Sequence, residues 1–240
     1  SKSAGDAGDP QHLLDQFGAD AVRMAMMFAA PPEQSFEWSE NGVESAYKWL
    51  RTRLWTTVQN HIAEGPMSAF DRNRLDDADK GLRRATHETL SKAFDDYGRR
   101  LAFNTVVAAA MTLMNHINKF DGRSSESRAV LSEALKAVVL VLSPITPHIS
   151  TALWRLLTGE ELSRAQWMAT DSSALVKTSI ELVVQINGKL RAKLDVAADI
   201  DEPSLRQRVA ELPNLSQYFE GKQIRKVIYV PQKLINFVVN

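Results

Sequence analysis

The chain has 240 residues, 44% of them hydrophobic and 24% charged, with 29 basic and 29 acidic side chains and no cysteine. This composition is typical of a soluble globular protein of one large or two modest domains. It excludes disulfides and thiolate metal sites, and it fits a reducing compartment. The longest apolar stretches, residues 137–142 and 227–230, are too short to cross a bilayer, and the first residues do not resemble a signal or transit peptide.

Residues 1–38 alternate short predicted elements with helix breakers. Ser1–Asp9 is small and polar and predicts a loop, after which a helix should run from Pro10 to Gly18. A second helix is expected from Asp20 to the breaking pair Pro31-Pro32, followed by a brief extended piece at Ser35–Trp38. Residues 1–40 contain two basic and seven acidic side chains, so this region is acidic.

Residues 39–170 are predicted to form a bundle of amphipathic helices. Apolar residues recur at intervals of three and four, and breaks fall at Gly65-Pro66 and Ser143-Pro144. Five helices are expected, the first capped by Ser39 and the last opening at Pro147. The second carries the apolar residues Leu82, Leu90, Phe94 and Tyr97. The periodicity is lost after Gly159, and residues 171–179 are interpreted as a linker.

Residues 180–240 are predicted to form a small α+β domain. A β-hairpin with its turn at Asn187-Gly188 is followed by a helix near Pro203–Leu212 and by strands at Ile224–Val230 and Leu234–Val239. With ten basic and seven acidic side chains, residues 177–240 are mildly cationic.

The register of the hairpin can be argued from the side chains. A two-residue loop would mix apolar and charged side chains on one face, whereas a three-residue loop with a glycine bulge pairs Val184 with Leu190 and Leu182 with Ala192. On this prediction Leu190 is buried, and the opposite face carries Gln185, Lys189, Arg191 and Lys193. Such a row of cations suits either a polyanion or solvent, and the residues alone leave both open.

Few other residues carry chemistry. The histidines have no acidic or histidine neighbour at the spacing of metal ligands, so structural or surface roles are favoured for His12, His61, His87, His116 and His148. No glycine-rich phosphate loop follows a strand. The pairs Arg83-Arg84 and Arg99-Arg100 could contact RNA phosphates, but a solvated helix face is favoured.

Three separated motifs resemble bacterial leucyl-tRNA synthetases, a family of class I aminoacyl-tRNA synthetases. The first comprises residues 17–23, 28–34 and 37–39, and the second is Pro144-Ile-Thr-Pro-His148 with Leu153-Trp154. The third comprises the hairpin and the run from Arg225 to Asn236. The resemblance covers nearly the whole chain in the order of the family.

The resemblance implies a multi-domain, mainly α fold. Residues 1–38 would be the end of a catalytic loop and a short α/β stem-contact region, and residues 39–170 an anticodon-binding-type helix bundle. Residues 180–240 would be an α+β domain that reaches the tRNA elbow. The nucleotide-binding fold and the editing domain of the family would precede residue 1, so this chain alone should not activate leucine.

The resemblance also implies roles for individual residues. Ser1, Lys2 and Ser3 would end the Lys-Met-Ser-Lys-Ser loop, in which Lys2 contacts ATP phosphates; the sequence departs from the family at Ala4–Gly8, where a lysine and asparagines are usual. Because the family does not depend on reading the anticodon, shape and backbone contacts should dominate tRNA binding. The predicted tRNA-binding residues are Lys189, Arg191, Lys193, Lys222, Arg225 and Lys226.

The expected partners are tRNA(Leu) and the catalytic and editing domains of the same enzyme. ATP with magnesium would be used by the full enzyme, and this fragment alone would bind no cofactor or metal. A monomeric, cytoplasmic protein without a membrane partner is expected. The alternative is a stand-alone RNA-binding or scaffold protein built from synthetase-derived domains.

Overall fold

The computed structural model describes residues 10–31, 39–65, 69–177 and 179–240. The predicted loop at Ser1–Asp9 and the extended piece at Ser35–Trp38 lie outside these residues. The described chain divides into two compact units, residues 1–175 and 176–240, and each has its own hydrophobic core. The first unit is helical and the second is a four-stranded sheet with two helices.

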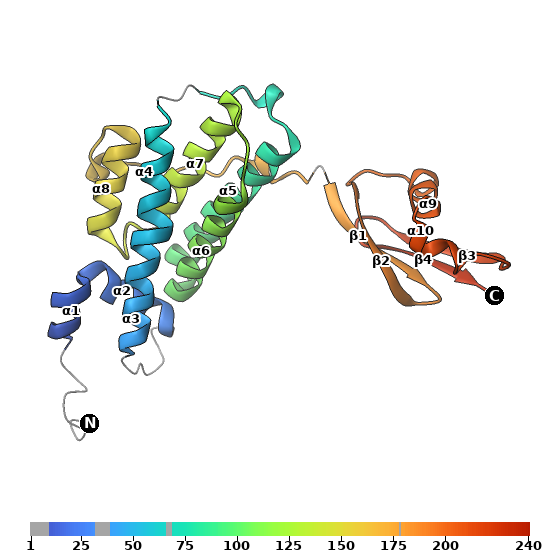
Figure 1. The fold of residues 1–240 in the computed structure, drawn as a ribbon, viewed down its shortest axis with the longest axis horizontal. Helices are drawn as coiled ribbons and strands as arrows, with labels where there is room; N and C mark the ends of the chain where they lie inside the picture. Colours follow the sequence, from blue (N-terminus) through green and yellow to red (C-terminus); the bar gives the residue numbers. More distant parts are fainter. Residues whose placement is uncertain (1–9, 32–38, 66–68, 178) are drawn as a thin grey trace, which may run out of the picture. The chain divides into compact units, whose positions relative to one another are not determined.

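The first unit begins with two short helices and one long one. Helix α1 spans Gln11–Phe17 and α2 spans Ala19–Ala29, with Gly18 at φ 81° between them. Helix α3 (Glu40–Lys48), a wider π-helical stretch η1 (Trp49–Trp55) and α4 (Thr56–Ala63) run on as one continuous helix (Figure 1). The Ser39 hydroxyl accepts the N–H of Gly42, as its predicted capping role requires.

Three further long helices and a shorter one complete the bundle. The long helices are α5 (Asp77–Asp95), α6 (Phe103–Lys119) and α7 (Ser125–Leu142), with short helical turns at η2 (Arg72–Arg74) and η3 (Asp96–Arg100). Helix α8 (Pro147–Thr158) follows the Ser143-Pro144 break and ends at Gly159, in the left-handed conformation that glycine favours. The turns η4 (Leu162–Arg164) and η5 (Ser172–Leu175) end the unit.

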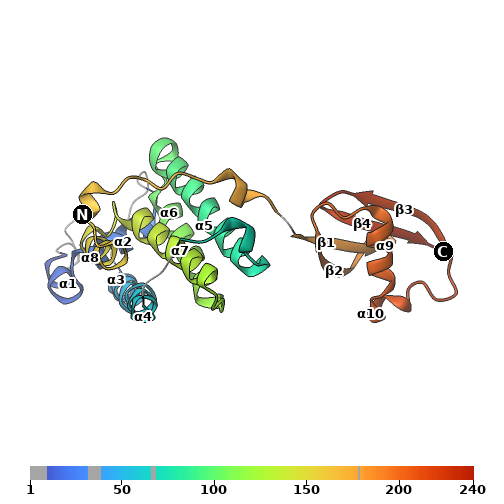
Figure 2. The same cartoon turned by 90° about the horizontal axis from the view of Figure 1, so that it is seen from above.

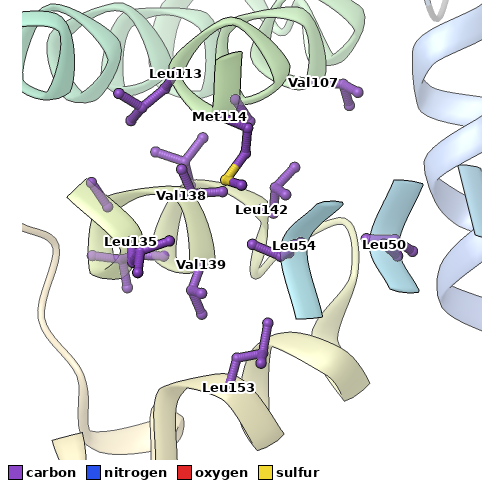
Figure 3. Close-up of a cluster of buried hydrophobic side chains, with 14 of the residues drawn as sticks. Leu50, Leu54, Val107, Leu113, Met114, Leu135, Val138, Val139, Leu142 and Leu153 are labelled. Atoms are coloured by element: carbon purple, nitrogen blue, oxygen red, sulfur yellow. The ribbon is translucent and has the colours of Figure 1, made fainter. Parts of the chain in front are cut away.

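The core of the bundle is built around α7. Leu135, Val138 and Leu142 of this helix are fully buried, and apolar side chains of α6, α8 and η1 meet them (Figure 3). The predicted apolar periodicity is therefore confirmed for most positions. Phe94 is an exception, because its side chain is 67% exposed and contacts Trp167 at a ring-centroid distance of 6.4 Å.

The second unit is a four-stranded sheet covered on one face. The strands are β1 (Ser179–Ile186), β2 (Lys189–Ala197), β3 (Ile224–Val230) and β4 (Leu234–Val239), in the order β2-β1-β4-β3. The central strands β1 and β4 are parallel, and each outer strand is antiparallel to its neighbour. Helices α9 (Glu202–Ala210) and α10 (Pro213–Ser216) contribute Leu205, Val209 and Leu215 to the core, and α9 is seen over one side of the sheet (Figures 1 and 2).

The predicted register of the hairpin is wrong. Ile186 pairs with Lys189, so the turn contains only Asn187 and Gly188, both with positive φ. Ile186 and Lys189 remain a mixed pair, but a β-bulge prevents further mixing, because Gln185 pairs with Leu190 whereas Val184 pairs with Ala192 and not with Arg191.

The bulge changes which residues share a face of the sheet. Arg191 is the extra residue, and beyond it Leu194 and Val196 join the buried face. Leu190 is opposite Gln185 on the uncovered face, where its side chain is 55% exposed, so the prediction that Leu190 is buried is also wrong. The turn is tied to β4, since the Asn187 side chain accepts the N–H of Val239.

Candidate nucleic-acid interface

The six basic residues predicted to bind RNA lie at the two outer strands of the sheet and not on one face of the hairpin. All are exposed: Lys189, Arg191 and Lys193 on β2, and Lys222, Arg225 and Lys226 in or just before β3. Three strand spacings, roughly 14 Å, separate the two outer strands. The positive charge is therefore divided between two edges.

The pairing of the strands shows which of these cations are level with one another. Lys189 of β2 pairs with Ile186 of β1, and Ile186 pairs with Phe237 of β4. Phe237 in turn pairs with Val227 of β3, so Lys189 and Val227 lie at the same level of the sheet. Lys226 lies one residue before Val227, so Lys189 and Lys226 mark the same end of the sheet on opposite edges. Lys193 lies four residues farther along β2.

Two cations of β2 already have partners. The Lys193 ammonium lies 2.7 Å from a carboxylate oxygen of Glu181, whose hydrogen bond and charge raise the pKa of the lysine. The Arg191 guanidinium lies over the Tyr218 ring, 4.5 Å from its centroid, an arrangement that leaves guanidinium N–H groups free to donate. Within the described residues, Lys189 makes no ion pair.

The arginine pairs of the bundle differ in their surroundings. Arg83 is buried, which contradicts the favoured solvated face for this residue. Arg99 is exposed and donates two hydrogen bonds of 2.6 and 2.7 Å to Asp95, one turn away on the same helical run. Arg84 and Arg100 pair in the same way with acidic residues of their own helical segments. These three arginines are at least partly neutralised by neighbours.

Arg83 belongs to a polar network that the sequence did not reveal. It donates to Glu133 at 3.2 Å and to Asp171 at 2.8 Å, and His87 contacts Glu133 through Nε2 at 2.8 Å. The i, i+4 spacing of Arg83 and His87 places them on one face of α5, which was the available signal. The acidic partners of Arg83 are 50 and 88 residues away and could not be seen from spacing.

Two further histidines, His61 and His148, differ in their surroundings. Within the described residues, no group of three or more histidines, cysteines or acidic residues is placed to hold a metal. His61 is buried, and burial, together with the charge of Arg128, lowers its pKa. His148 is exposed, with Nδ1 3.7 Å from Asp20. Structural or surface positions for these histidines match the prediction.

Two of the motifs that carried the resemblance contact one another. The Asp20 carboxylate accepts the backbone N–H groups of His148 and Ile149, at 3.3 and 2.7 Å, and so caps α8 from α2. Arg23 donates to the carbonyl oxygens of Pro144 and Ile145 at 2.9 and 2.8 Å. The observed partners of Arg23 are therefore backbone carbonyl groups of the segment before α8.

Ser1, Lys2 and Ser3 lie outside the described residues, so their role stays a prediction. None of the described helices is long and apolar enough to cross a membrane.

Comparison with known proteins places the chain in a family. Residues 79–206 match the model of the anticodon-binding domain of tRNA ligase, and the chain belongs to this family. Its relatives include leucine–tRNA ligases of Alcanivorax borkumensis and Chromohalobacter salexigens, each 52% identical over 241 aligned residues and 100% of this chain. The chain spans 29% and 28% of the length of these relatives. The matches confirm the resemblance drawn from the motifs.

Solved structures agree with this assignment. The LeuRS in the LeuRS-tRNA-LeuAMS ternary complex of Agrobacterium radiobacter K84 agnB2 is 27% identical, with a TM-score of 0.79; the match covers 100% of this chain and 31% of that one. The methionyl-tRNA synthetase of Mycobacterium tuberculosis, with methionyl-adenylate, shares the fold over 73% of this chain and 37% of its own, with a TM-score of 0.57 at 19% identity.

Proposed function

We propose that this chain is the tRNA-binding portion of a leucine–tRNA ligase, the enzyme that attaches leucine to tRNA(Leu) using ATP. The observation that carries the proposal is the identity of about half of all residues to leucine–tRNA ligases along the entire chain. The arrangement of Asp20 and Arg23 supports it, because two motifs of the family form one contact in the structure. A stand-alone RNA-binding or scaffold protein is not favoured by these relatives.

The whole enzyme would supply what this chain lacks. A nucleotide-binding fold would bind ATP and magnesium, and Lys2, with Ser1 and Ser3, would belong to its phosphate-contacting loop. A lysine there offers a mobile charge to phosphate oxygens, which suits adenylate formation. We further propose a monomeric, cytoplasmic enzyme in which the two units described here hold the tRNA.

Within the small unit, we propose that Lys189, Arg191, Lys222, Arg225 and Lys226 contact RNA phosphates and that Lys193 contributes less. Glu181 offsets the charge of Lys193, whereas Lys189 is exposed and forms no ion pair within the described residues. Phosphate contacts release counterions, so binding should weaken with salt. The two edges could contact two phosphate strands, which suits a folded RNA better than a single strand.

The test is a titration of tRNA(Leu) at several salt concentrations, with a second tRNA as the specificity control. Replacing Lys189, Arg225 and Lys226 by Ala should weaken binding by about 1–3 kcal/mol and reduce the salt slope. Among single variants, Lys193→Ala should change affinity less than Lys189→Ala, because the charge of Lys193 is paired. Equal effects of Lys189→Ala and Lys193→Ala would contradict the assignment.

The ligase activity needs a separate test. Combining this chain with the catalytic and editing portion of a close relative should restore leucylation of tRNA(Leu), whereas this chain alone should give none. A folded complex that binds tRNA but never leucylates it would favour the stand-alone RNA-binding protein.

A further inference from the structure

Residues 160–175 lack helical periodicity, yet the structure packs them against the bundle. The Trp167 ring meets Tyr97 edge-on at a centroid distance of 6.3 Å, and Met168 packs against the core of the first unit. The sequence predicted a linker at 171–179, but residues 171–175 belong to the first compact unit. Only residues 176–178 separate them from the first strand, which begins at Ser179.

Asp171 connects this segment to α5. Its carboxylate accepts hydrogen bonds from Arg83 at 2.8 Å and from the N–H and hydroxyl of Ser173 at 3.0 and 2.6 Å, and Arg72 pairs with it at 2.8 Å. The Ser173 hydrogen bonds and the Arg83 charge hold the pKa of Asp171 well below its usual value. The same residue therefore caps the short turn η5 and binds two arginines of the bundle.

The backbone of Asp171 is also held. Its N–H donates to Nδ1 of His87 at 3.0 Å, so this nitrogen carries no proton and Nε2 must donate to Glu133. Arg83 donates to the same Glu133 and lies 4.9 Å from the centroid of the Phe70 ring. Arg83 therefore holds the side chain of Asp171 and His87 holds its backbone, and both of these residues are held in turn by Glu133.

We propose that Asp171 is a positioning residue for RNA binding: it determines where the connection to the small unit begins and so confines the reach of that unit's cations. This rests on the proposed function. From Leu175 to Ser179 an extended chain reaches about 14 Å, whereas from Met168, the next packed residue, it reaches about 38 Å. The effective concentration of the small unit near a tRNA held by the bundle falls with roughly the 3/2 power of the length of the connecting segment. Release of residues 169–175 should therefore lower the affinity of the whole chain for tRNA about fivefold.

The test compares Asp171→Ala with Asp79→Asn in the intact chain. Asp79 is the control, because it is a buried carboxylate of α5 that accepts the Ser127 hydroxyl at 2.6 Å, away from residues 160–175. In Asp171→Ala, hydrogen exchange of residues 169–175 should accelerate at least about tenfold, and the Kd for tRNA(Leu) should rise about fivefold with an unchanged salt slope. In Asp79→Asn, hydrogen exchange of residues 169–175 and the Kd for tRNA(Leu) should both stay close to those of the unmodified chain.

Ser173→Ala provides a milder variant should Asp171→Ala fold poorly. It removes one hydroxyl donor to Asp171 and should move exchange and Kd in the same direction by smaller factors. Faster exchange with unchanged Kd, or an equal loss of affinity in Asp79→Asn, would overturn the positioning role. Unchanged exchange would overturn the anchor itself, whereas failure of the unmodified chain to bind tRNA would overturn the proposed function.

Discussion

At the scale of single residues, burial and pairing give several charged side chains a different role from the one predicted from the sequence. Arg83 is a buried structural residue, and Lys193 is paired with Glu181. Leu190 is exposed because the two-residue turn places it opposite Gln185, on the uncovered face of the sheet. Pairing and burial, and not residue type alone, therefore decide which cations remain exposed and unpaired among the described residues.

The register of β2 gives a prediction for two leucines four residues apart. Leu190→Lys should leave the small unit folded and change its unfolding free energy by less than about 0.5 kcal/mol, because the side chain is exposed. Leu194→Lys should unfold the unit, because Leu194 is 8% exposed and a charge cannot be buried there without a partner. Far-UV circular dichroism and urea unfolding of both variants measure the difference. The opposite order would support the three-residue loop.

At the scale of elements, single carboxylates connect helices that are distant in the sequence. Asp20 of α2 caps α8, and Asp171 caps η5 while binding α5. Such contacts explain why residues distant in sequence specify one arrangement of the helices. Each provides a place where a single carboxylate can be tested.

Asp20→Ala should lower the unfolding free energy of the bundle by about 1–2 kcal/mol, because two N–H groups at the start of α8 lose their acceptor. Asp15→Ala is the control, because Asp15 is exposed and accepts a hydrogen bond from Gln11 of its own helix. It should cost less than about 0.5 kcal/mol in urea unfolding. Equal costs would show that the cap contributes nothing.

The depressed pKa of Asp171 predicts a pH dependence. A carboxylate whose folded pKa is lowered stabilises the fold above its unfolded value, here 3.8, and this contribution is lost as the pH falls toward the folded value. Asp171→Asn should therefore be less stable than the unmodified protein at pH 7 by about 1–2 kcal/mol. The gap, measured by urea unfolding, should narrow below about pH 4. A difference in stability between the two proteins that stays constant down to pH 2.5 would contradict the depressed pKa of Asp171.

At the scale of the whole molecule, the two compact units have separate cores. The sequence predicted this division from the change of period at Ile180, and it predicted most of the bundle from apolar spacing at residues such as Leu54 and Leu135. It could not predict where residues 165–175 lie, because Trp167 and Asp171 contact Tyr97 and His87, which are 70 and 84 positions away.

The sequence identified the cations of the small unit but not their arrangement. Side-chain alternation alone does not distinguish a longer turn from a two-residue turn followed by a bulge, since both keep Leu182 and Val184 on the buried face. Nor does it give the strand order that separates Lys189 from Lys226.

Separate cores predict separate unfolding transitions. Leu135→Ala should destabilise the bundle by about 2–5 kcal/mol and leave the small unit unchanged, and Leu205→Ala should do the reverse. All five tryptophans lie within residues 1–175, so their fluorescence reports the bundle, whereas Tyr218 and Tyr229 are the tyrosines of the small unit. A single transition that both variants shift equally would contradict independent cores.

The position of β4 in the sheet has a consequence for protein synthesis. This strand is made after the other three, yet it lies between β1 and β3 and pairs with both. A nascent chain without β4 holds only the β1–β2 hairpin, which is marginal by itself, and exposes the apolar face of β1 and its free backbone edge. Translation that stops before Leu234 therefore yields a folded bundle joined to an unfolded segment. Chaperones and proteases can recognise such a segment, so the small unit folds only in chains that include β4.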